Sequence, residues 1–244
     1  MDIWQERFSL KFSDIDPSDR LTLGAAFAYF QEASINHAER LGVGRAAMAQ
    51  TGQVWILSRI SVVFERRPRY GETITLRSWP RGAEKLFALR DYDIRDAADT
   101  PLILGRSGWL ILDMEKRRPL RPQGVVEQLP LNQGLDALPE GLVGLDARDT
   151  LAKVGERRAA YSDIDYNGHV NNARYIQWIQ DILDPPILEQ ASRMRLDINY
   201  LSELKGGDRT TLWTAPLNGS GFAIEGRRQD TGHAVFRAEL RVQP

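Results

Sequence analysis

Three polar side chains alternate along one short stretch of the sequence: Asp165, Asn167 and His169. A further carboxylate, Glu203, follows at the end of a predicted strand, just before a Lys-Gly-Gly turn. Imidazole changes its charge near neutral pH, and a carboxylate in a suitable environment acts as a general base. If the fold brings them together, these side chains can bind a water molecule and remove its proton.

The elements that would position these residues occur twice. Ser-Asp-Ile-Asp at residues 13–16 recurs at residues 162–165, after a short alternating strand in both cases. A stretch with helical apolar spacing follows each copy, in which Gln31 falls opposite Gln180, and four predicted strands follow each helix. One helix can fill the concave face of a curved antiparallel sheet. The sequence therefore predicts an α+β protein of two similar units that pair their sheets edge to edge.

The first copy of the repeat acts as an internal control for the second. It keeps the aspartate as Asp16, but Ser18 replaces the asparagine and Arg20 replaces the histidine. The position of the distant glutamate is taken by Arg67. A duplication that served structure alone has no reason to differ so selectively, so the sequence predicts chemistry in the second unit only.

Composition sets the outer limits of the interpretation. The net charge is −1, and no nucleic-acid motif is present, so we expect no nucleic-acid partner. The chain has no cysteine, which excludes disulfides, thiolate metal sites and a cysteine nucleophile. We expect no metal and no cofactor. No apolar run approaches the ~18 residues of a membrane span, and no signal-peptide pattern is visible, so we expect a cytoplasmic protein without membrane insertion.

The boundary between the units is predicted from a segment rich in Pro and Gly. We place the first unit at residues 1–125, a linker at 126–154 and the second unit at 155–244. Whether the chain stays a monomer with an internal pseudo-dimer or forms a homodimer is left open by the sequence.

The segment at residues 165–175, Asp-Tyr-Asn-Gly-His-Val-Asn-Asn-Ala-Arg-Tyr, resembles the corresponding segment of plant-type and bacterial acyl-acyl carrier protein thioesterases. Residues 55–59 and 67–72, and Trp109 with the residues after it, are similar to the first unit of that family. The resemblance implies a tandem (double) hot-dog fold and hydrolysis of acyl-acyl carrier protein to a free fatty acid. It also implies a catalytic network of Asp165, Asn167, His169 and Glu203. Some plant members carry a cysteine where this chain has Leu204, so a thiol mechanism is excluded here.

Within that family, the available groups suggest a division of roles. Glu203 is the expected base, provided that burial raises its pKa toward neutrality, and Asn167 is expected to hold the water. Asp165 is the expected orienter of the His169 ring. Backbone N–H groups where the helix starts, near Asn171 and Asn172, can stabilise an oxyanion, although either asparagine can simply cap the helix. In the rival route, a carboxylate attacks directly and forms an anhydride.

The acyl chain is expected in the first unit. Phe27 and Phe30 share one helical stripe, and with Trp55 and Leu57 they can line a tunnel or merely form core. An acidic carrier protein would dock on basic residues, for which residues 66–69 and 116–121 are the candidates; a solvated charged face is the default explanation for any such run. Two alternatives remain: an acyl-CoA thioesterase of the same fold, and a non-catalytic acyl-binding protein. The sequence does not specify acyl chain length.

Overall fold

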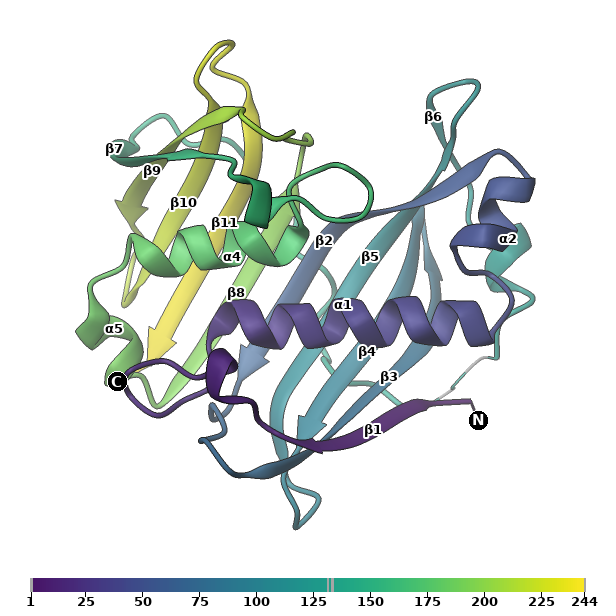
Figure 1. Cartoon of the computed structure of the whole chain (residues 1–244), viewed down its shortest axis with the longest axis horizontal. Helices are drawn as coiled ribbons and strands as arrows, with labels where there is room; N and C mark the ends of the chain where they lie inside the picture. The colour runs from purple at the N-terminus through teal and green to yellow at the C-terminus, as the bar shows by residue number, and fades with distance from the viewer. Residues whose placement is uncertain (1, 131, 133, 244) are drawn as a thin grey trace.

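Two helices lie on one face of a large antiparallel sheet (Figure 1). The computed structural model describes residues 2–130, 132 and 134–243. Within them the strand order is β1-β3-β4-β5-β2-β8-β11-β10-β9-β7, and β6 pairs with the end of β5. This arrangement confirms the α+β class predicted from the sequence.

The two halves repeat one order of elements. The first half contains β1 (Trp4–Ser9), α1 (Leu23–Arg40), α2 (Arg45–Gln50), β2 (Gln53–Phe64), β3 (Thr73–Glu84), β4 (Phe87–Arg95), β5 (Pro101–Asp113), β6 (Arg118–Leu120) and α3 (Gln123–Val126). The second half contains β7 (Ala152–Arg158), α4 (Asn172–Asp181), α5 (Pro185–Glu189), β8 (Arg193–Tyr200), β9 (Arg209–Pro216), β10 (Gly221–Arg228) and β11 (Ala234–Gln243).

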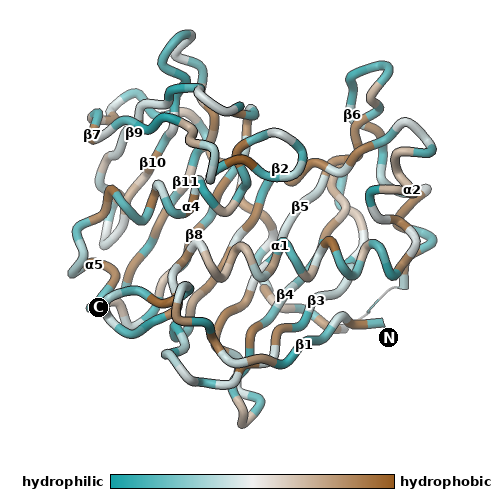
Figure 2. The backbone as a smooth tube through the Cα atoms, viewed as in Figure 1, coloured by the Kyte–Doolittle hydropathy of each residue, from teal (hydrophilic) through white to brown (hydrophobic). Residues whose placement is uncertain are grey.

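The halves join along one pair of strands. β2 pairs antiparallel with β8, from Arg59 opposite Asn199 to Phe64 opposite Met194. The sheets of the two halves are therefore one continuous hydrogen-bonded surface, with β1 and β7 as the outer strands. Hydrophobic residues run along the strands beneath α1 and α4, whereas many of the connecting loops are hydrophilic (Figure 2). In the described part of the chain, no helix has the length and apolarity needed to cross a membrane.

Each long helix begins at a polar cap. Thr22 caps α1, and its side chain accepts a hydrogen bond from the Ala25 N–H at 3.1 Å. Asn171 caps α4 in the same way through the Ala173 N–H at 2.9 Å. The sequence predicted a long helix in both halves, but α4 has 10 residues against 18 in α1. The Pro-Pro pair that opens α5 follows closely, and proline cannot extend a preceding helix.

The two helices touch where α1 begins. A side chain at Gly24 would place its Cβ 2.5 Å from Cγ of Gln177 in α4, so only glycine permits this approach. Beside it, Gln180 of α4 accepts a hydrogen bond from the Leu23 N–H at 3.1 Å. The side chain of one helix thereby satisfies a free donor at the start of the other.

The connection between the halves runs along the sheet. Asp91 in β4 accepts a hydrogen bond from the Ala137 N–H, and Asn199 in β8 bonds the backbone at both Val143 and Leu145. Further along, Arg148 pairs with Glu239 of β11 at 2.7 Å. Asp91 lies on the opposite side of β4 from Tyr92, which stacks on Phe30 of α1, so the connection straps the sheet face turned away from the helices. β7 starts at Ala152, inside the segment predicted as linker.

Candidate active site

The turn before α4 presents the predicted histidine. The Asp165 N–H donates to the His169 carbonyl at 2.8 Å, and Oδ1 of Asp165 accepts from the Asn167 N–H at 2.8 Å. Gly168 has a φ of 82°, a left-handed conformation that glycine adopts without strain. These contacts fold residues 165–169 into a tight turn that leads into the cap of α4.

The turn brings His169 against Glu203, which is distant in the sequence. His169 Nε2 lies 3.1 Å from Glu203 Oε2. Two backbone contacts hold this register: the Val170 N–H donates to the Leu204 carbonyl at 2.8 Å, and Arg228 Nη1 donates to the Glu203 carbonyl at 3.1 Å. Leu204, the residue after Glu203, is fully buried.

Two expected roles do not match this geometry. The Asp165 carboxylate contacts backbone in its own turn, and among the described residues it makes no hydrogen bond to the His169 ring. The carboxylate that orients the ring is Glu203. Glu203 itself is 58% exposed and His169 30%, so the burial that a base at Glu203 was expected to have is absent from the free protein. The Asn167 side chain is exposed.

A contact from the first half steadies the same turn. The guanidinium of Arg45, at the start of α2, lies 4.0 Å from the ring centroid of Tyr166. This cation–π contact joins residues 165–169 to the first half across an otherwise exposed surface. The histidine turn is therefore positioned by both halves.

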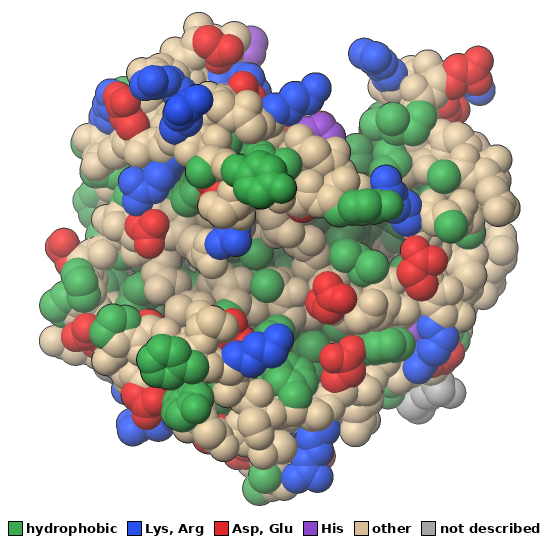
Figure 3. All heavy atoms as spheres, in the orientation of Figure 1, with side chains coloured by type: hydrophobic (Ala, Val, Ile, Leu, Met, Phe, Trp, Pro, Cys, Tyr) green, Lys and Arg blue, Asp and Glu red, His purple; other side chains and the backbone are tan. Residues whose placement is uncertain are grey.

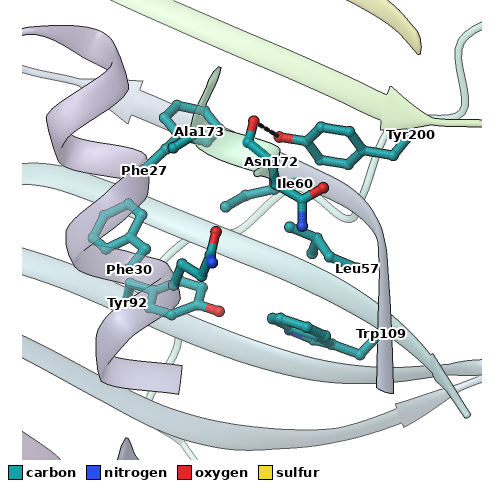
Figure 4. A pocket seen from close by; sticks show the side chains of 10 residues that line it. Phe27, Phe30, Leu57, Ile60, Tyr92, Trp109, Asn172, Ala173 and Tyr200 are labelled. Carbon is teal, nitrogen blue, oxygen red and sulfur yellow. Dashed lines mark hydrogen bonds between the residues drawn. The ribbon is translucent and has the colours of Figure 1, made fainter. Parts of the chain in front are cut away.

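A small cavity lies where α1, α4 and the seam of the sheet meet (Figure 4). Four residues predicted to bind substrate line it: Phe27, Phe30, Leu57 and Asn172. The other lining residues are Gln31, Ile60, Tyr92, Trp109, Ala173 and Tyr200. Its free volume is about 10 Å³, which is roughly the space of one water molecule. This cavity is therefore much smaller than the acyl tunnel expected from the sequence.

Two predicted binding residues lie outside this cavity. Trp55 donates its Nε1–H to the Val43 carbonyl at 2.8 Å and thereby holds the segment between α1 and α2. Asn171 uses its side chain to cap α4. Sequence reasoning missed Tyr92 and Tyr200, since an aromatic residue in a predicted strand gives no sign of which face it occupies until the register is known.

Polar groups lie buried under the cavity. The Tyr92 hydroxyl is 2.7 Å from the hydroxyls of both Ser34 and Ser107, and Trp109 donates to Ser107 at 2.7 Å. Arg90 is buried in the same layer and contacts His37 Nδ1 at 3.0 Å. Burial, together with the positive charge of Arg90 and Arg40, lowers the pKa of His37 to about 4. His37 is thus neutral and structural at physiological pH.

The matching turn in the first half, at residues 16–20, makes different contacts. Asp16 accepts from the Ser18 N–H at 2.9 Å, as Asp165 does from Asn167, but it also pairs with the buried Arg67. Arg67 in turn donates to the Leu188 carbonyl of α5 at 2.8 Å. Burial alone would raise the pKa of Asp16, but the hydrogen bonds from Ser18 and Arg67 outweigh it and lower the pKa. Through the buried Arg67, the first-half turn forms a clamp between the halves.

This clamp takes Arg67 out of one of the two candidate docking clusters. At residues 66–69, Arg67 is buried and Arg66 forms a two-pronged pair with Glu72. At residues 116–121, by contrast, the four basic side chains are exposed at the hairpin between β5 and β6. Among the described residues, no group of three or more His, Cys, Asp or Glu side chains is arranged to hold a metal ion.

Two family models match the chain. One, described as the acyl-ACP thioesterase N-terminal domain, matches residues 1–128, and the other, described as the C-terminal domain, matches residues 147–240. The palmitoyl-acyl carrier protein thioesterase of Gossypium hirsutum, described as chloroplastic, is 28% identical over 215 residues. That alignment covers 82% of this chain and 52% of the relative, so the chain spans about half the length of that protein.

Solved structures share the fold. An acyl-ACP thioesterase from Bacteroides thetaiotaomicron has a TM-score of 0.84 at 23% identity, covering 99% of this chain and 98% of that one. The 12:0-ACP thioesterase from Umbellularia californica has a TM-score of 0.80 at 22% identity, covering 99% and 97%. The resemblance seen in the sequence is confirmed by the two family models, which together span most of the chain: it belongs to the acyl-ACP thioesterase family.

Proposed function

We propose that the protein hydrolyses the thioester of acyl-acyl carrier protein and releases a free fatty acid. The observation that carries the proposal is the His169–Glu203 contact of 3.1 Å, in the same turn-and-helix unit whose residue Asn172 lines the apolar cavity. Such a hydrolase needs two parts: a general base that water can reach, and an apolar cavity for the acyl chain.

The proposal includes a division of labour between two hot-dog units. Residues 1–125 would bind the acyl chain, residues 126–154 would connect, and residues 155–244 would carry the catalytic groups. The repeated order of elements supports this, as do α1 and α4, each set against the sheet of its own half. The exposed His169–Glu203 pair, against the buried Arg67 at the matching place, supports chemistry in the second unit alone.

The proposed reaction is attack by water on the thioester carbonyl carbon. Glu203 keeps one carboxylate oxygen on the His169 ring and uses the other to take a proton from the water, while Asn167 accepts from the second O–H. The new C–O bond forms, the C–S bond breaks, and the proton passes from Glu203 to the departing sulfur. Binding of the acyl-phosphopantetheine arm over Glu203 supplies the desolvation that the free protein lacks.

The anhydride route makes a different isotopic prediction. In single turnovers with excess enzyme in ¹⁸O-water, general-base hydrolysis places the label in the fatty acid and leaves every enzyme carboxylate unlabelled. Label in the peptide that contains Glu203 or Asp165 would exclude the general-base route and support direct carboxylate attack.

The carrier protein is proposed to dock at the β5–β6 hairpin. Lys116, Arg117, Arg118 and Arg121 are exposed there, and they complement an acidic partner. In the space-filling view, a notch separates this hairpin, at upper right, from the lobe that contains the second half (Figure 3). The lobe at upper left in this view also carries several basic side chains, so the choice of the hairpin rests on its own exposed basic residues.

A substrate panel tests the proposal. We expect a higher kcat/KM for an acyl group on carrier protein than for the same group on CoA, and we expect Arg117→Glu with Arg118→Glu to reduce the rate on carrier protein alone. Equal rates on both carriers would favour an acyl-CoA thioesterase. Binding of acyl groups without release of thiol would make the chain an acyl-binding protein. The cytoplasmic location stays a prediction, since the cotton relative is described as chloroplastic.

A further inference from the structure

One polar atom on the cavity wall lacks a partner. Oε1 of Gln31, a residue of α1, is inaccessible to solvent and accepts no hydrogen bond from any residue that the structure describes. Gln31 lines the cavity together with Asn172 of α4. A buried amide oxygen without a donor is unfavourable for folding, and a half-turn of the amide relieves this cost when the Nε2–H group that then faces the gap meets a bound acceptor.

The internal repeat shows what a satisfied glutamine at this position looks like. Gln180 of α4 is the counterpart of Gln31, and Leu23, the first residue of α1, is the counterpart of Asn172. Gln180 Oε1 accepts from the Leu23 N–H at 3.1 Å, which closes the contact between the helices. At the equivalent place in the repeat, no hydrogen bond between Gln31 and the Asn172 N–H is present in the described structure. The cavity takes the place of that bond.

The gap has room for a single oxygen atom. Its volume is about that of one water molecule and its walls are mostly apolar, and Gln31 and Asn172, the first residue of α4, are the two amide residues that line it. The Asn172 carbonyl is held by the Tyr200 hydroxyl at 3.1 Å, which fixes the orientation of this peptide. The first N–H groups of a helix favour negative charge, and His169 lies three residues before Asn172 in the sequence.

We propose that Gln31, contributed by the first half, binds the thioester carbonyl oxygen of the substrate together with the Asn172 N–H. A half-turn of the Gln31 amide directs its Nε2–H group into the gap, where both N–H groups donate to the carbonyl oxygen as it becomes an oxyanion. The inference rests on the proposed function: the cavity then joins the acyl chain in the first half to the His169–Glu203 pair in the second.

Matched substitutions at the two glutamines test this assignment. Gln31→Met is expected to lower kcat by about 10²–10³-fold, the usual effect of losing one oxyanion donor, with KM changed much less. Its Tm is expected to stay equal or rise, because the variant replaces an unsatisfied amide with an apolar side chain. Gln180→Met is expected to do the reverse: it lowers Tm, because the Leu23 N–H loses its acceptor, and it leaves kcat of the folded enzyme nearly unchanged.

A charge variant adds a readout that packing alone would not change. In Gln31→Glu, the ionised carboxylate repels the oxyanion, whereas the protonated acid donates a hydrogen bond to it. The kcat of this variant relative to the native enzyme is therefore expected to rise as the pH is lowered through the titration of the introduced carboxyl group, a trend that Gln31→Met does not show.

The outcomes separate this inference from the proposed function. If Gln31→Met lowers Tm as Gln180→Met does and keeps its kcat, Gln31 is a packing residue and the inference is overturned. If His169→Asn also keeps full hydrolysis, the fault lies with the proposed site as a whole. Loss of activity in His169→Asn with none in Gln31→Met rejects the inference alone.

Discussion

The turns before α1 and α4 have the same backbone and opposite uses. In each, the aspartate N–H donates at 2.8 Å to the carbonyl four residues on, at Arg20 in the first turn and His169 in the second. In the first turn, Asp16 pairs with Arg67, which is buried and donates to the Leu188 carbonyl of the other half. In the second turn, His169 contacts Glu203, which faces solvent.

The difference shows how the same turn can serve stability in the first half and, under the proposed function, catalysis in the second. A charge can be buried when a partner and hydrogen bonds satisfy it, and Arg67 has both at its two Nη atoms, while its Nε has no partner among the described residues. Such a charge cannot exchange protons or meet a substrate. His169 and Glu203 remain accessible to water. The clamp at the first turn stabilises the fold that carries them.

The largest expected effect concerns the reactive turn. Glu203→Gln removes the base and keeps the size of the side chain, so we expect kcat to fall by about 10²–10⁴-fold. Because the side chain is 58% exposed, the free energy of unfolding should hardly change. Steady-state hydrolysis and urea unfolding measure the two quantities. A variant that unfolds early, or that keeps its rate, would contradict the division between the turns.

The clamp predicts the opposite pattern. Arg67→Met leaves the Asp16 carboxylate buried without its cation, so we expect a loss of about 3–5 kcal/mol in the free energy of unfolding. The kcat of the folded fraction should be retained. The double variant with Asp16→Asn should recover part of the loss, because the amide oxygen still accepts from the Ser18 N–H. Failure of the double variant to recover would remove the ion pair as the cause.

A pH effect is expected from the part of α1 that α4 lacks. The pKa of His37 is about 4 in the folded protein, against about 6.5 when unfolded. Between these values the unfolded chain binds a proton that the folded one does not, so stability falls as the pH is lowered from about 6.5 to 4, by at most about 3 kcal/mol. Urea unfolding at several pH values measures this slope. His37→Gln should flatten it, whereas the same change at the exposed His233 should not.

The smallest effect concerns the left-handed position shared by both turns. Gly168 has φ 82° and Asp19 has φ 60°. Gly168→Ala should cost about 1 kcal/mol through backbone strain alone, because a Cβ there meets open space. Asp19→Gly should gain about 0.5 kcal/mol, since glycine relieves the strain. Thermal unfolding of both variants checks the sign; a stabilised Gly168→Ala would show that the turns differ in backbone.

The sequence predicted those features of the fold that a comparison of the two repeats reveals. Aligning the halves indicated the order of the elements and an edge-to-edge pairing of the two units, because duplicated chains keep their spacing. The network that includes His169 and Glu203 was implied by the family resemblance. The partner of Asp165 could not be predicted, since a short carboxylate satisfies its own turn as readily as a neighbouring ring. Trp55 lies in a strand as expected, but its indole N–H donates to the Val43 carbonyl and it is not among the residues that line the cavity.

The fastening of the halves has a mechanical consequence. The β2–β8 seam, the strap across the other face and the Arg67–Leu188 contact tie them at three separate places. Such a frame cannot open like a pair of jaws. Under the proposed function, an acyl chain would enter by displacing side chains that line the cavity, such as Phe27 and Phe30, and not by a hinge motion of the two halves. Shape selectivity would then belong to the rotamers of a few aromatic residues.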